Sequence, residues 1–238
     1  MAKQSEIVAA ITREFKAAAD PKYREGMQRF FKEPVTLYGV RTPDWRRISQ
    51  QYWTQVKHLP KSEVFKLCEE LLAVRNGEER GVAFDWAGRM RKLLEPADFS
   101  RLERWLMEHV SNWGSCDSLS TGVLGNFLVD HPASLPRAQA WAGSKNRWLR
   151  RAAAVALIPA VKQEKYLPEA YATADVLLLD EDDMVQKGYG WMLKEASNKR
   201  PTEVFEFVMK RKARMPRTAL RYAIEKLPPA WRKQAMAR

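Results

Sequence analysis

The chain has 238 residues, of which 45% are hydrophobic and 29% are charged. This composition is too apolar for a disordered protein and is ordinary for a chain that buries its own core. With 41 Lys and Arg against 29 Asp and Glu, the formal net charge is +12, so we expect a polyanionic partner, nucleic acid before an anionic membrane surface. No apolar run approaches the roughly 20 residues of a membrane span, and the first residues lack the apolar block of a secretory signal. We therefore expect a cytoplasmic protein with no membrane partner.

The few cysteine and histidine residues argue against a metal centre or a disulfide framework. Cys68 and Cys116 lie in apolar or helical surroundings, as reduced thiols do. His58, His109 and His131 are scattered and form no ligand spacing such as HxxxH. The sequence also has no nucleotide-binding glycine loop and no Ser/His/Asp ordering, so we expect neither a metal nor another cofactor.

Apolar residues recur at spacings of three and four almost throughout, which predicts helices along the whole chain. In chain order we expect helices over residues 5–18 and 21–32, an extended loop over EPVTLYGV, and a helix over residues 42–56 that Thr42 caps. Further helix starts are predicted at Ser62, about Glu78, Glu95 or Pro96, Ser115, Ser134, Asn146, about Leu167, Asp182, Pro201, Pro216 and Pro229.

The helix starts repeat with a nearly constant period. Starts near residues 78, 115, 146, 182 and 216 are separated by 37, 31, 36 and 34 residues, which is typical of stacked helix pairs. Gly122, Gly125, Gly188 and Gly190 fall inside these helices, where glycine costs about 1 kcal/mol relative to alanine, so we expect a backbone or a ligand to approach closely. We predict an all-α fold with one domain over residues 1–238, a superhelical solenoid of HEAT-like antiparallel helix pairs with a concave basic groove.

Three arginines begin the predicted helix RWLRRAAAVAL. Arg147, Arg150 and Arg151 share one face of it, and cations at a helix N-terminus oppose the helix dipole. Their placement favours an external anion, which a phosphodiester backbone would supply. The alternative is a solvated basic face.

Two further basic groups indicate the same partner. Arg41, Arg46 and Arg47 surround the TPDW helix start, and KRKARMPRTALRY has six cations in twelve positions without an acid, which is costly without a counter-charge. If these groups share the concave face, they line a groove suited to a DNA duplex. The cations of the second group are Lys210, Arg211, Lys212, Arg214, Arg217 and Arg221.

Two of the nine tryptophans differ from the others in their neighbours. Trp113 precedes Gly114 and Trp191 follows Gly190, so one face of each indole is predicted to be accessible. An accessible indole stacks on a sugar or base, or attracts a cation through its π electrons. For any single tryptophan, a place in the core is the simpler interpretation.

Asp117 is an acid in a chain that is rich in cations. It follows Ser115 at a predicted helix start, where either side chain could cap the free amide groups. In a groove that holds polyanions, however, a carboxylate repels the expected ligand and must have a specific task. Stabilising a transient positive charge is such a task.

Four motifs in one order give the chain a family resemblance. The chain resembles the AlkD-type DNA glycosylases, which are HEAT-like repeat proteins that remove alkylated purines, and the similarity covers most of its length. The motifs are LYGVRTPDWRR at 37–47, NWGSCDS at 112–118, WLRRAA at 148–153 and QKGYGWMLKE at 186–195.

The resemblance implies an active site. Motif by motif, the family's aspartate falls on Asp117, its two tryptophans on Trp113 and Trp191, and its arginine on Arg151. These residues would line the cleft against the sugar and backbone of the damaged nucleotide, without a base-binding pocket. Asp117 would stabilise the sugar cation that forms as the base leaves. The implied enzyme is monofunctional and monomeric, and leaves an abasic site in double-stranded DNA.

Three positions depart from the family pattern. Relatives can carry a second tryptophan and a further acid where this chain has Asn112 and Gly114, and a tyrosine in the second helix in place of Phe30. These changes bear on lesion preference and rate, and they leave the central carboxylate intact. The expected DNA-binding residues are Arg41, Arg46, Arg47, Arg147, Arg150, Lys187, Lys210, Lys212, Arg214 and Arg217.

Two other functions fit the same sequence. A non-catalytic DNA-binding solenoid that recognises unusual DNA structures would share the charge, fold and groove, and Asp117 with both tryptophans favours the enzyme over it. A protein-binding helical scaffold would bind an acidic protein tightly even at high salt and would have no DNA affinity. We expect a glycosylase that acts on 3-methyladenine and 7-methylguanine in duplex DNA.

Overall fold

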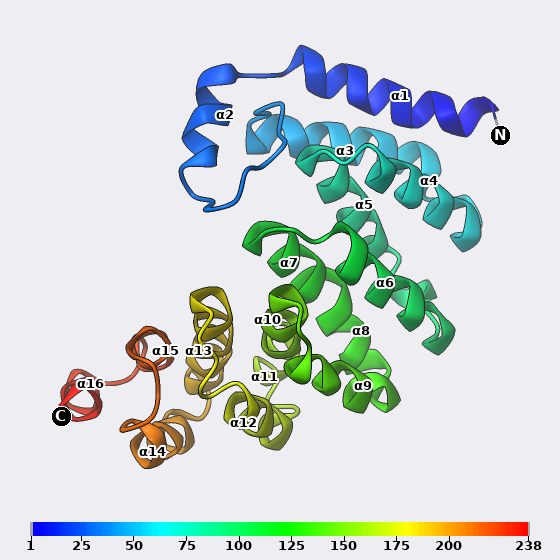
Figure 1. Cartoon of the computed structure of the whole chain (residues 1–238). Helices are drawn as coiled ribbons and strands as arrows, with labels where there is room; N and C mark the ends of the chain where they lie inside the picture. The colour runs from blue at the N-terminus through cyan, green and yellow to red at the C-terminus, as the bar shows by residue number, and fades with distance from the viewer. Residues whose placement is uncertain (1, 238) are drawn as a thin grey trace. The chain divides into compact units, whose positions relative to one another are not determined.

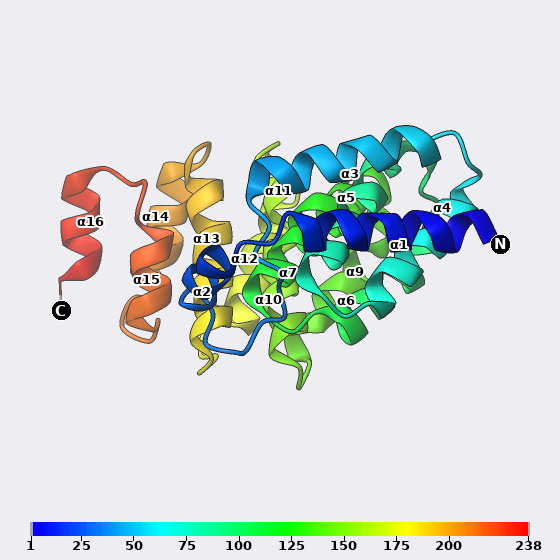
Figure 2. The ribbon, with the colours of Figure 1, turned by 90° about the horizontal axis from the view of Figure 1, so that it is seen from above.

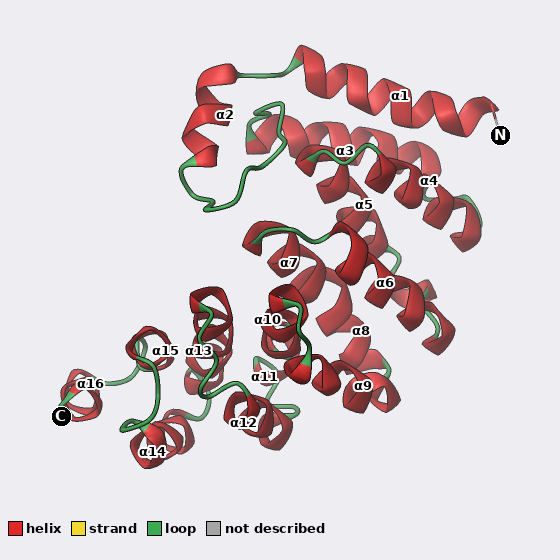
Figure 3. Ribbon diagram, viewed as in Figure 1, coloured by secondary structure: helices red, strands yellow, loops and turns green. Residues whose placement is uncertain are grey.

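Every regular element of the described chain is a helix. The computed structural model describes residues 2–237, with side chains from residue 6 onward, and it contains no strand in that range (Figure 3), which confirms the predicted all-α class. No helix within this range is long and apolar enough to cross a bilayer. The α-helices, labelled in Figure 1, are α1 (Ala2–Ala17), α2 (Pro21–Gln28), α3 (Thr42–Val56), α4 (Lys61–Ala73), α5 (Gly77–Arg89), α6 (Phe99–His109), α7 (Trp113–Leu119), α8 (Gly125–Asp130), α9 (Leu135–Gln139), α10 (Arg147–Val155), α11 (Ile158–Val161), α12 (Leu167–Val176), α13 (Asp183–Ser197), α14 (Pro201–Arg211), α15 (Arg217–Ala223) and α16 (Pro229–Met236). The shorter elements are 3₁₀ turns η1 (Arg91–Leu93), η2 (Pro96–Asp98), η4 (Pro132–Ser134) and η5 (Ala140–Gly143), and a π-helical turn η3 (Ser120–Leu124) between α7 and α8.

Helix starts follow capping chemistry that can be recognised in the sequence. Asn146 and Asp182 each accept a hydrogen bond from the backbone N–H two residues later, at 2.9 and 2.8 Å, so α10 and α13 begin where the sequence predicts. Helix α3 has Pro43 in its first turn and covers the predicted range, but the prediction that Thr42 caps it is wrong. Thr42 is the first helical residue, and the N-cap is Arg41, which forms no side-chain capping hydrogen bond. The bounds of the first two helices differ from the predicted ones. Helix α1 begins at Ala2 rather than at residue 5, and α2 ends at Gln28 rather than near residue 32.

The chain forms two compact units. The first comprises the described residues through Leu94 together with Glu108–Ser118, and it contains α1–α5 and nearly all of α7. Within it, α1 packs against α3 and α4, and α5 packs against α4 across a short link (Figure 2). Apolar side chains that are almost completely buried form its core, among them Ile11, Phe15, Ile48, Val64, Leu67, Leu71, Val82 and Trp86.

The second unit comprises Glu95–Met107 and the residues from Leu119 onward. In it, α10, α13 and α15 pack side by side in that order, with α12 against α13 and α14 against α15 (Figure 1). The successive pairs α12–α13 and α14–α15 agree with the predicted repeat. The single repeat domain over residues 1–238 stays a prediction.

Two glycines allow helices of the second unit to approach closely. A Cβ atom on Gly125 of α8 would lie 2.5 Å from the backbone oxygen of Ala156, and one on Gly190 of α13 would lie 2.9 Å from that of Ala219 in α15. Both distances are too short for a side chain, so the predicted close approach is confirmed at these positions. The prediction of a close approach is wrong for Gly122, because no atom of a neighbouring segment lies within 4 Å of a Cβ atom placed there.

A buried carboxylate fixes the loop before α3. Residues 34–41 have no regular structure, as predicted for this stretch. Glu78, in the first turn of α5, accepts hydrogen bonds from the backbone N–H groups of residues 38–40 at 3.2, 2.9 and 3.2 Å. Gly39 has a φ of 89°, and a Cβ atom on it would lie 2.4 Å from the carbonyl oxygen of Asp20, so only glycine fits in this loop.

The neighbouring Glu79 is a buried carboxyl group whose ionisation opposes folding. It accepts a hydrogen bond from the Thr12 hydroxyl at 2.8 Å, yet burial outweighs this bond and raises the pKa of Glu79 above its ordinary value of 4.5. The folded protein therefore keeps this proton to a higher pH than the unfolded chain does. As a result, this group makes the free energy of unfolding fall as the pH rises above its ordinary pKa of 4.5.

We expect Glu79→Gln to raise the free energy of unfolding at neutral pH, because the amide does not ionise. The gain should shrink as the pH falls towards the unfolded pKa, and urea unfolding at a series of pH values measures it. Glu25→Gln is the matched control, since Glu25 is exposed in the same unit and its replacement should leave the profile unchanged. If the free energy of unfolding of wild type and of Glu79→Gln depended on pH in the same way, the prediction would be contradicted.

Candidate functional site

Helix α7 begins at Trp113 and is capped by Asn112. The side-chain oxygen of Asn112 accepts the backbone N–H of Ser115 at 2.9 Å, and the Ser115 hydroxyl donates to the Asn112 carbonyl at 3.0 Å. These are the hydrogen bonds of an N-cap residue. They give Asn112, at a position where relatives can carry a second tryptophan, a structural role in this chain. The predicted start at Ser115 is wrong by two residues. Asp117 lies inside the helix, so its interpretation as a cap is also wrong.

Asp117 and Trp113 lie on the same face of α7. They are four residues apart in an α-helix, which places their Cβ atoms about 5–6 Å from each other. Both side chains are half-buried. The first unit therefore presents a carboxylate beside an indole.

An aromatic segment after α2 holds the Trp113 indole. The ring of Phe31 stacks on it, with centroids 5.1 Å apart and planes inclined by 19°, and the indole N–H donates to the Phe30 carbonyl at 3.0 Å. Phe31 covers one π face, so Trp113 can offer at most the other face to a ligand. Phe30 lies beyond the end of α2 and is 69% exposed, rather than in the second helix as predicted.

Arg151 is buried in the second unit and extends towards α13. The residue is 5% exposed, and its guanidinium donates to the Met184 carbonyl. A Cβ atom on Gly188 would lie 3.1 Å from Arg151 Cγ, so this glycine makes room for the arginine stem. Lys187, on the same helix, pairs with Asp183 at 3.2 Å.

The other two arginines of α10 have carboxylate partners inside the unit. Arg150 Nε lies 2.6 Å from Asp180 Oδ2, and Arg147 Nε lies 2.7 Å from Asp182 Oδ2. The predicted preference of these two arginines for an external anion loses its basis, because acids 30 and 35 residues later in the sequence neutralise them. Arg147 and Arg150 stay predicted DNA-binding residues without that support. Together with Arg151, they fasten α10 to the segment at the start of α13.

We expect Arg150→Ala to lower the free energy of unfolding by about 2 kcal/mol, because it leaves the Asp180 carboxylate without its cation. The side chain of Asp180 is 9% exposed, so water replaces the lost partner poorly. Arg200→Ala is the control, since its pair with Glu164 has side chains that are 44% and 42% exposed and should contribute less than about 1 kcal/mol. Equal losses of unfolding free energy for the two variants would show that the buried ion pair contributes no more to stability than the exposed one.

Trp191 belongs to a charged cluster around Glu195. Its indole N–H donates to Glu195 Oε1 at 3.2 Å, and the carboxylate lies 3.5 Å from Lys162 Nζ and 3.6 Å from Lys226 Nζ. Burial acts to raise the pKa of Glu195, but the two lysines and the indole hydrogen bond outweigh it and bring that pKa below its usual value. Trp191 is half-buried on α13. Trp191 and Glu195 are one turn apart on α13, but sequence reasoning missed the cluster because Lys162 and Lys226 follow two other helices, α11 and α15.

The arginines near the start of α3 differ in their partners. Arg41 pairs with Asp20 at 2.8 Å while 63% of its side chain stays exposed, and Arg47 Nη1 lies 3.5 Å from Glu14 Oε2. Arg46 is exposed and forms no hydrogen bond or ion pair with the described residues. Arg46 is therefore the member of this group whose charge is least compensated.

The basic segment after α14 divides into structural and exposed cations. Lys212 and Arg217 donate to backbone carbonyls at the C-terminal end of α16, at distances from 2.9 to 3.3 Å, where the helix dipole attracts cations. Arg211 Nη2 donates to Asp175 at 2.7 Å. The exposed cations of this segment, which have no partner among residues 2–237, are Lys210, Arg214 and Arg221.

These features define an all-α protein of packed helix pairs, with an excess of positive charge and a carboxylate beside an indole. Residues 11–227 match the family model of the DNA alkylation repair enzymes. The match covers most of the chain, so the chain belongs to this family. It confirms, at the level of the family, the resemblance inferred from the four motifs. No curated protein sequence matches the chain.

Two solved structures share the fold. One is a predicted DNA alkylation repair enzyme from Enterococcus faecalis, with a TM-score of 0.77 at 21% identity over 89% of this chain and 97% of that one. The other is smu.31 from Streptococcus mutans UA159, with a TM-score of 0.58 at 19% identity over 77% of this chain and 92% of that one. At these identities the likeness establishes the fold.

Proposed function

We propose that the protein is a DNA glycosylase that hydrolyses the N-glycosidic bond of cationic alkylated purines in duplex DNA. Membership of the DNA alkylation repair family supports this class of reaction. The observation that carries the proposal is the place of Asp117, one turn from Trp113 within α7, at a helix whose cap is another residue. A carboxylate without a capping role, in a chain of net charge +12, suits a substrate that becomes positively charged.

The chemistry uses the charge that the lesion already carries. Alkylation at N3 or N7 makes the purine cationic and weakens its bond to C1′ of the deoxyribose. When this bond breaks, its electron pair leaves with the base, which becomes neutral, and the sugar becomes an oxocarbenium ion. Asp117 stabilises that ion and orients a water molecule, whose oxygen bonds to C1′ while a proton passes to the carboxylate. The open π face of Trp113 attracts the same positive charge.

The residues of the second unit act on the DNA backbone in this proposal. Arg151 binds a phosphate through its guanidinium, and Trp191 packs on a sugar with its ring oriented by the hydrogen bond to Glu195. No lysine amine has a catalytic role, so no Schiff base forms and the strand stays intact. The protein acts as a monomer in the cytoplasm, without a cofactor, and leaves an abasic site.

Incubation of the protein with methylated duplex DNA tests this function. We expect free 3-methyladenine or 7-methylguanine, detected by chromatography, and abasic sites that break only on later alkaline treatment. Duplex binding should weaken steeply as the salt concentration rises, because bound phosphates release their counterions. Binding of DNA without base release would contradict the proposed enzyme and indicate a non-catalytic DNA-binding protein. Absence of DNA binding would indicate a protein-binding scaffold.

A further inference from the structure

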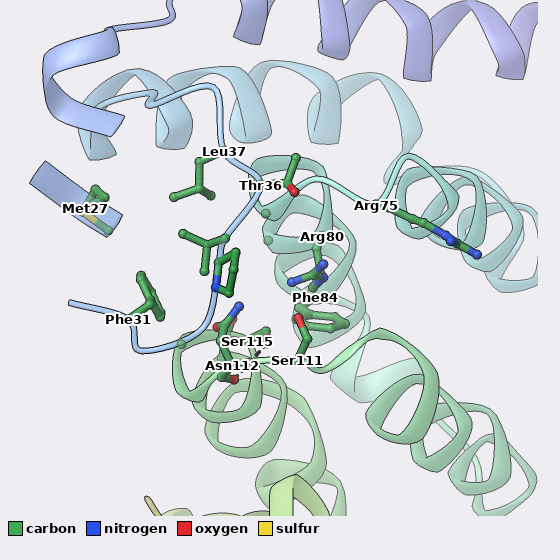
Figure 4. Close-up of a pocket in the computed structure, with 16 residues that line it drawn as sticks. Met27, Phe31, Thr36, Leu37, Arg75, Arg80, Phe84, Ser111, Asn112 and Ser115 are labelled. Carbon is green, nitrogen blue, oxygen red and sulfur yellow. Dashed lines mark hydrogen bonds between the residues drawn. The ribbon is translucent and has the colours of Figure 1, made fainter. Parts of the chain in front are cut away.

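A pocket of about 310 Å³ lies inside the first unit, next to the candidate site. Its walls come from the loop after α2, the first turns of α5 and the start of α7 (Figure 4). Phe31, which stacks on Trp113, also lines this pocket. The volume lies at the lower end of the range of roughly 300–1,000 Å³ that is typical of small-molecule sites.

Arg80, on α5, supplies the charge of this pocket. Its side chain lies beside Phe84 and Ser111 in Figure 4, and it forms no hydrogen bond or ion pair with the side chains described from residue 6 onward. Burial lowers the pKa of the Arg80 guanidinium, although an arginine stays protonated at neutral pH. Arg80 is half-buried and its charge has no carboxylate partner, unlike Arg150 of the second unit, which has a carboxylate at 2.6 Å.

The acids next to Arg80 in the sequence do not compensate it. Glu78 accepts three backbone N–H groups of the loop before α3, and Glu79 accepts the Thr12 hydroxyl. Among the residues that line the pocket, the charged side chains are Arg75 and Arg80, with no carboxylate. Arg75 points away from the other labelled side chains in Figure 4, so Arg80 is the cation that a ligand in the pocket would meet. The charge of the pocket therefore favours an anionic ligand.

The rest of the lining favours an anion that carries a flat, partly polar group. Phe31 supplies half-buried aromatic surface, Phe84 also lines the pocket but is only 2% exposed, and Ser111, Ser115 and Asn112 bring hydroxyl and amide groups to the same pocket. Aromatic surface stacks on a base, and hydroxyl and amide groups hydrogen-bond to base edges. A guanidinium binds a phosphate with charge-assisted hydrogen bonds. A nucleotide unit combines all three features.

We propose that this pocket binds a nucleoside monophosphate, with the phosphate on Arg80 and the base against Phe31. The ligand is either a free mononucleotide or an unpaired nucleotide within DNA, since both present the same groups. This inference goes beyond the proposed glycosylase and does not depend on it, because the pocket is separate from Asp117 and its test uses unmodified nucleotides.

Isothermal titration with 2′-deoxyguanosine 5′-monophosphate tests the pocket directly. We expect wild type to bind this nucleotide and Arg80→Gln to bind it at least tenfold more weakly, as the loss of a charge-assisted phosphate contact predicts. 2′-Deoxyguanosine, which lacks the phosphate, should bind wild type and Arg80→Gln equally. Arg13→Gln is the control, since Arg13 is exposed in the same unit outside the pocket, and it should bind the nucleotide like wild type.

A second variant and two duplexes complete the test. Ser118→Trp should fill the pocket from its exposed rim and abolish binding of nucleotide and nucleoside alike, while Arg80 stays in place. If the ligand is part of DNA, a duplex with one unpaired nucleotide binds wild type more tightly than a fully paired one, and Arg80→Gln removes the difference. If only the mononucleotide depends on Arg80, the free ligand is the source. Nucleotide affinity that Arg80→Gln leaves unchanged, or absence of binding by both ligands, would overturn the proposal.

Discussion

Asp117→Asn is expected to lower the rate of alkylpurine excision at least tenfold, which corresponds to about 1.4 kcal/mol of activation free energy. Asparagine keeps the shape of the side chain but removes the negative charge that would stabilise the sugar cation. Duplex affinity should be retained or rise, because the carboxylate no longer repels the phosphates. Single-turnover release of 7-methylguanine measures the first effect, and fluorescence anisotropy with unmodified duplex measures the second.

Asp44→Asn is the matched control for this substitution. Asp44 is an acid of the same unit, with 49% of its side chain exposed on α3, so its loss changes the net charge by the same amount. Its excision rate should stay within about twofold of wild type, as for most surface substitutions. If the Asp117→Asn protein excises as fast as wild type, a different carboxylate performs the chemistry, and the assignment of Asp117 is wrong.

The helices that could be predicted are those that local chemistry defines. Asn146 and Asp182 are oxygen-bearing side chains directly before apolar helical patterns, and each accepts the expected backbone N–H. The start of α7 was predicted incorrectly because Asn112, Ser115 and Asp117 are all suitable caps within six positions. Tertiary packing decides among them, since it buries Asn112 to 7% exposure against the first turn of the helix. A single sequence does not contain that information.

Charge compensation could not be predicted, because partners in a helical repeat protein come from neighbouring repeats. Arg150 belongs to a group that looks unbalanced in the sequence, yet Asp180 neutralises it from the next helix pair. Arg80 shows the opposite case, since it directly follows Glu78 and Glu79 and looks compensated. Both acids are occupied elsewhere in the structure. The sequence thus indicated the family and suggested the acid and indoles of the proposed site, whereas the electrostatics of individual arginines required the fold.

Glu78→Ala is expected to lower the free energy of unfolding by about 3 kcal/mol, the largest loss of stability expected here. The carboxylate accepts the backbone N–H groups of residues 38–40 at 3.2, 2.9 and 3.2 Å, and alanine would leave these donors without an acceptor where Gly39 and Val40 are buried and Tyr38 is half-buried. The carboxylate also lies in the first turn of α5, where the helix dipole favours a negative charge. Urea unfolding measures the loss.

Glu78→Gln separates the hydrogen bonds from the charge. Glutamine keeps one oxygen, which can still accept the N–H groups of Gly39 and Val40, and loses the acceptor for Tyr38. Its loss of stability should therefore be about half that of Glu78→Ala. Because residues 34–37 of the same loop line the pocket around Arg80, Glu78→Ala should also weaken binding of the mononucleotide, and Glu78→Gln should do so less. Stability within 0.5 kcal/mol of wild type for Glu78→Ala would mean that water satisfies the loop amides as well as the carboxylate does, because surface substitutions typically stay within about that limit.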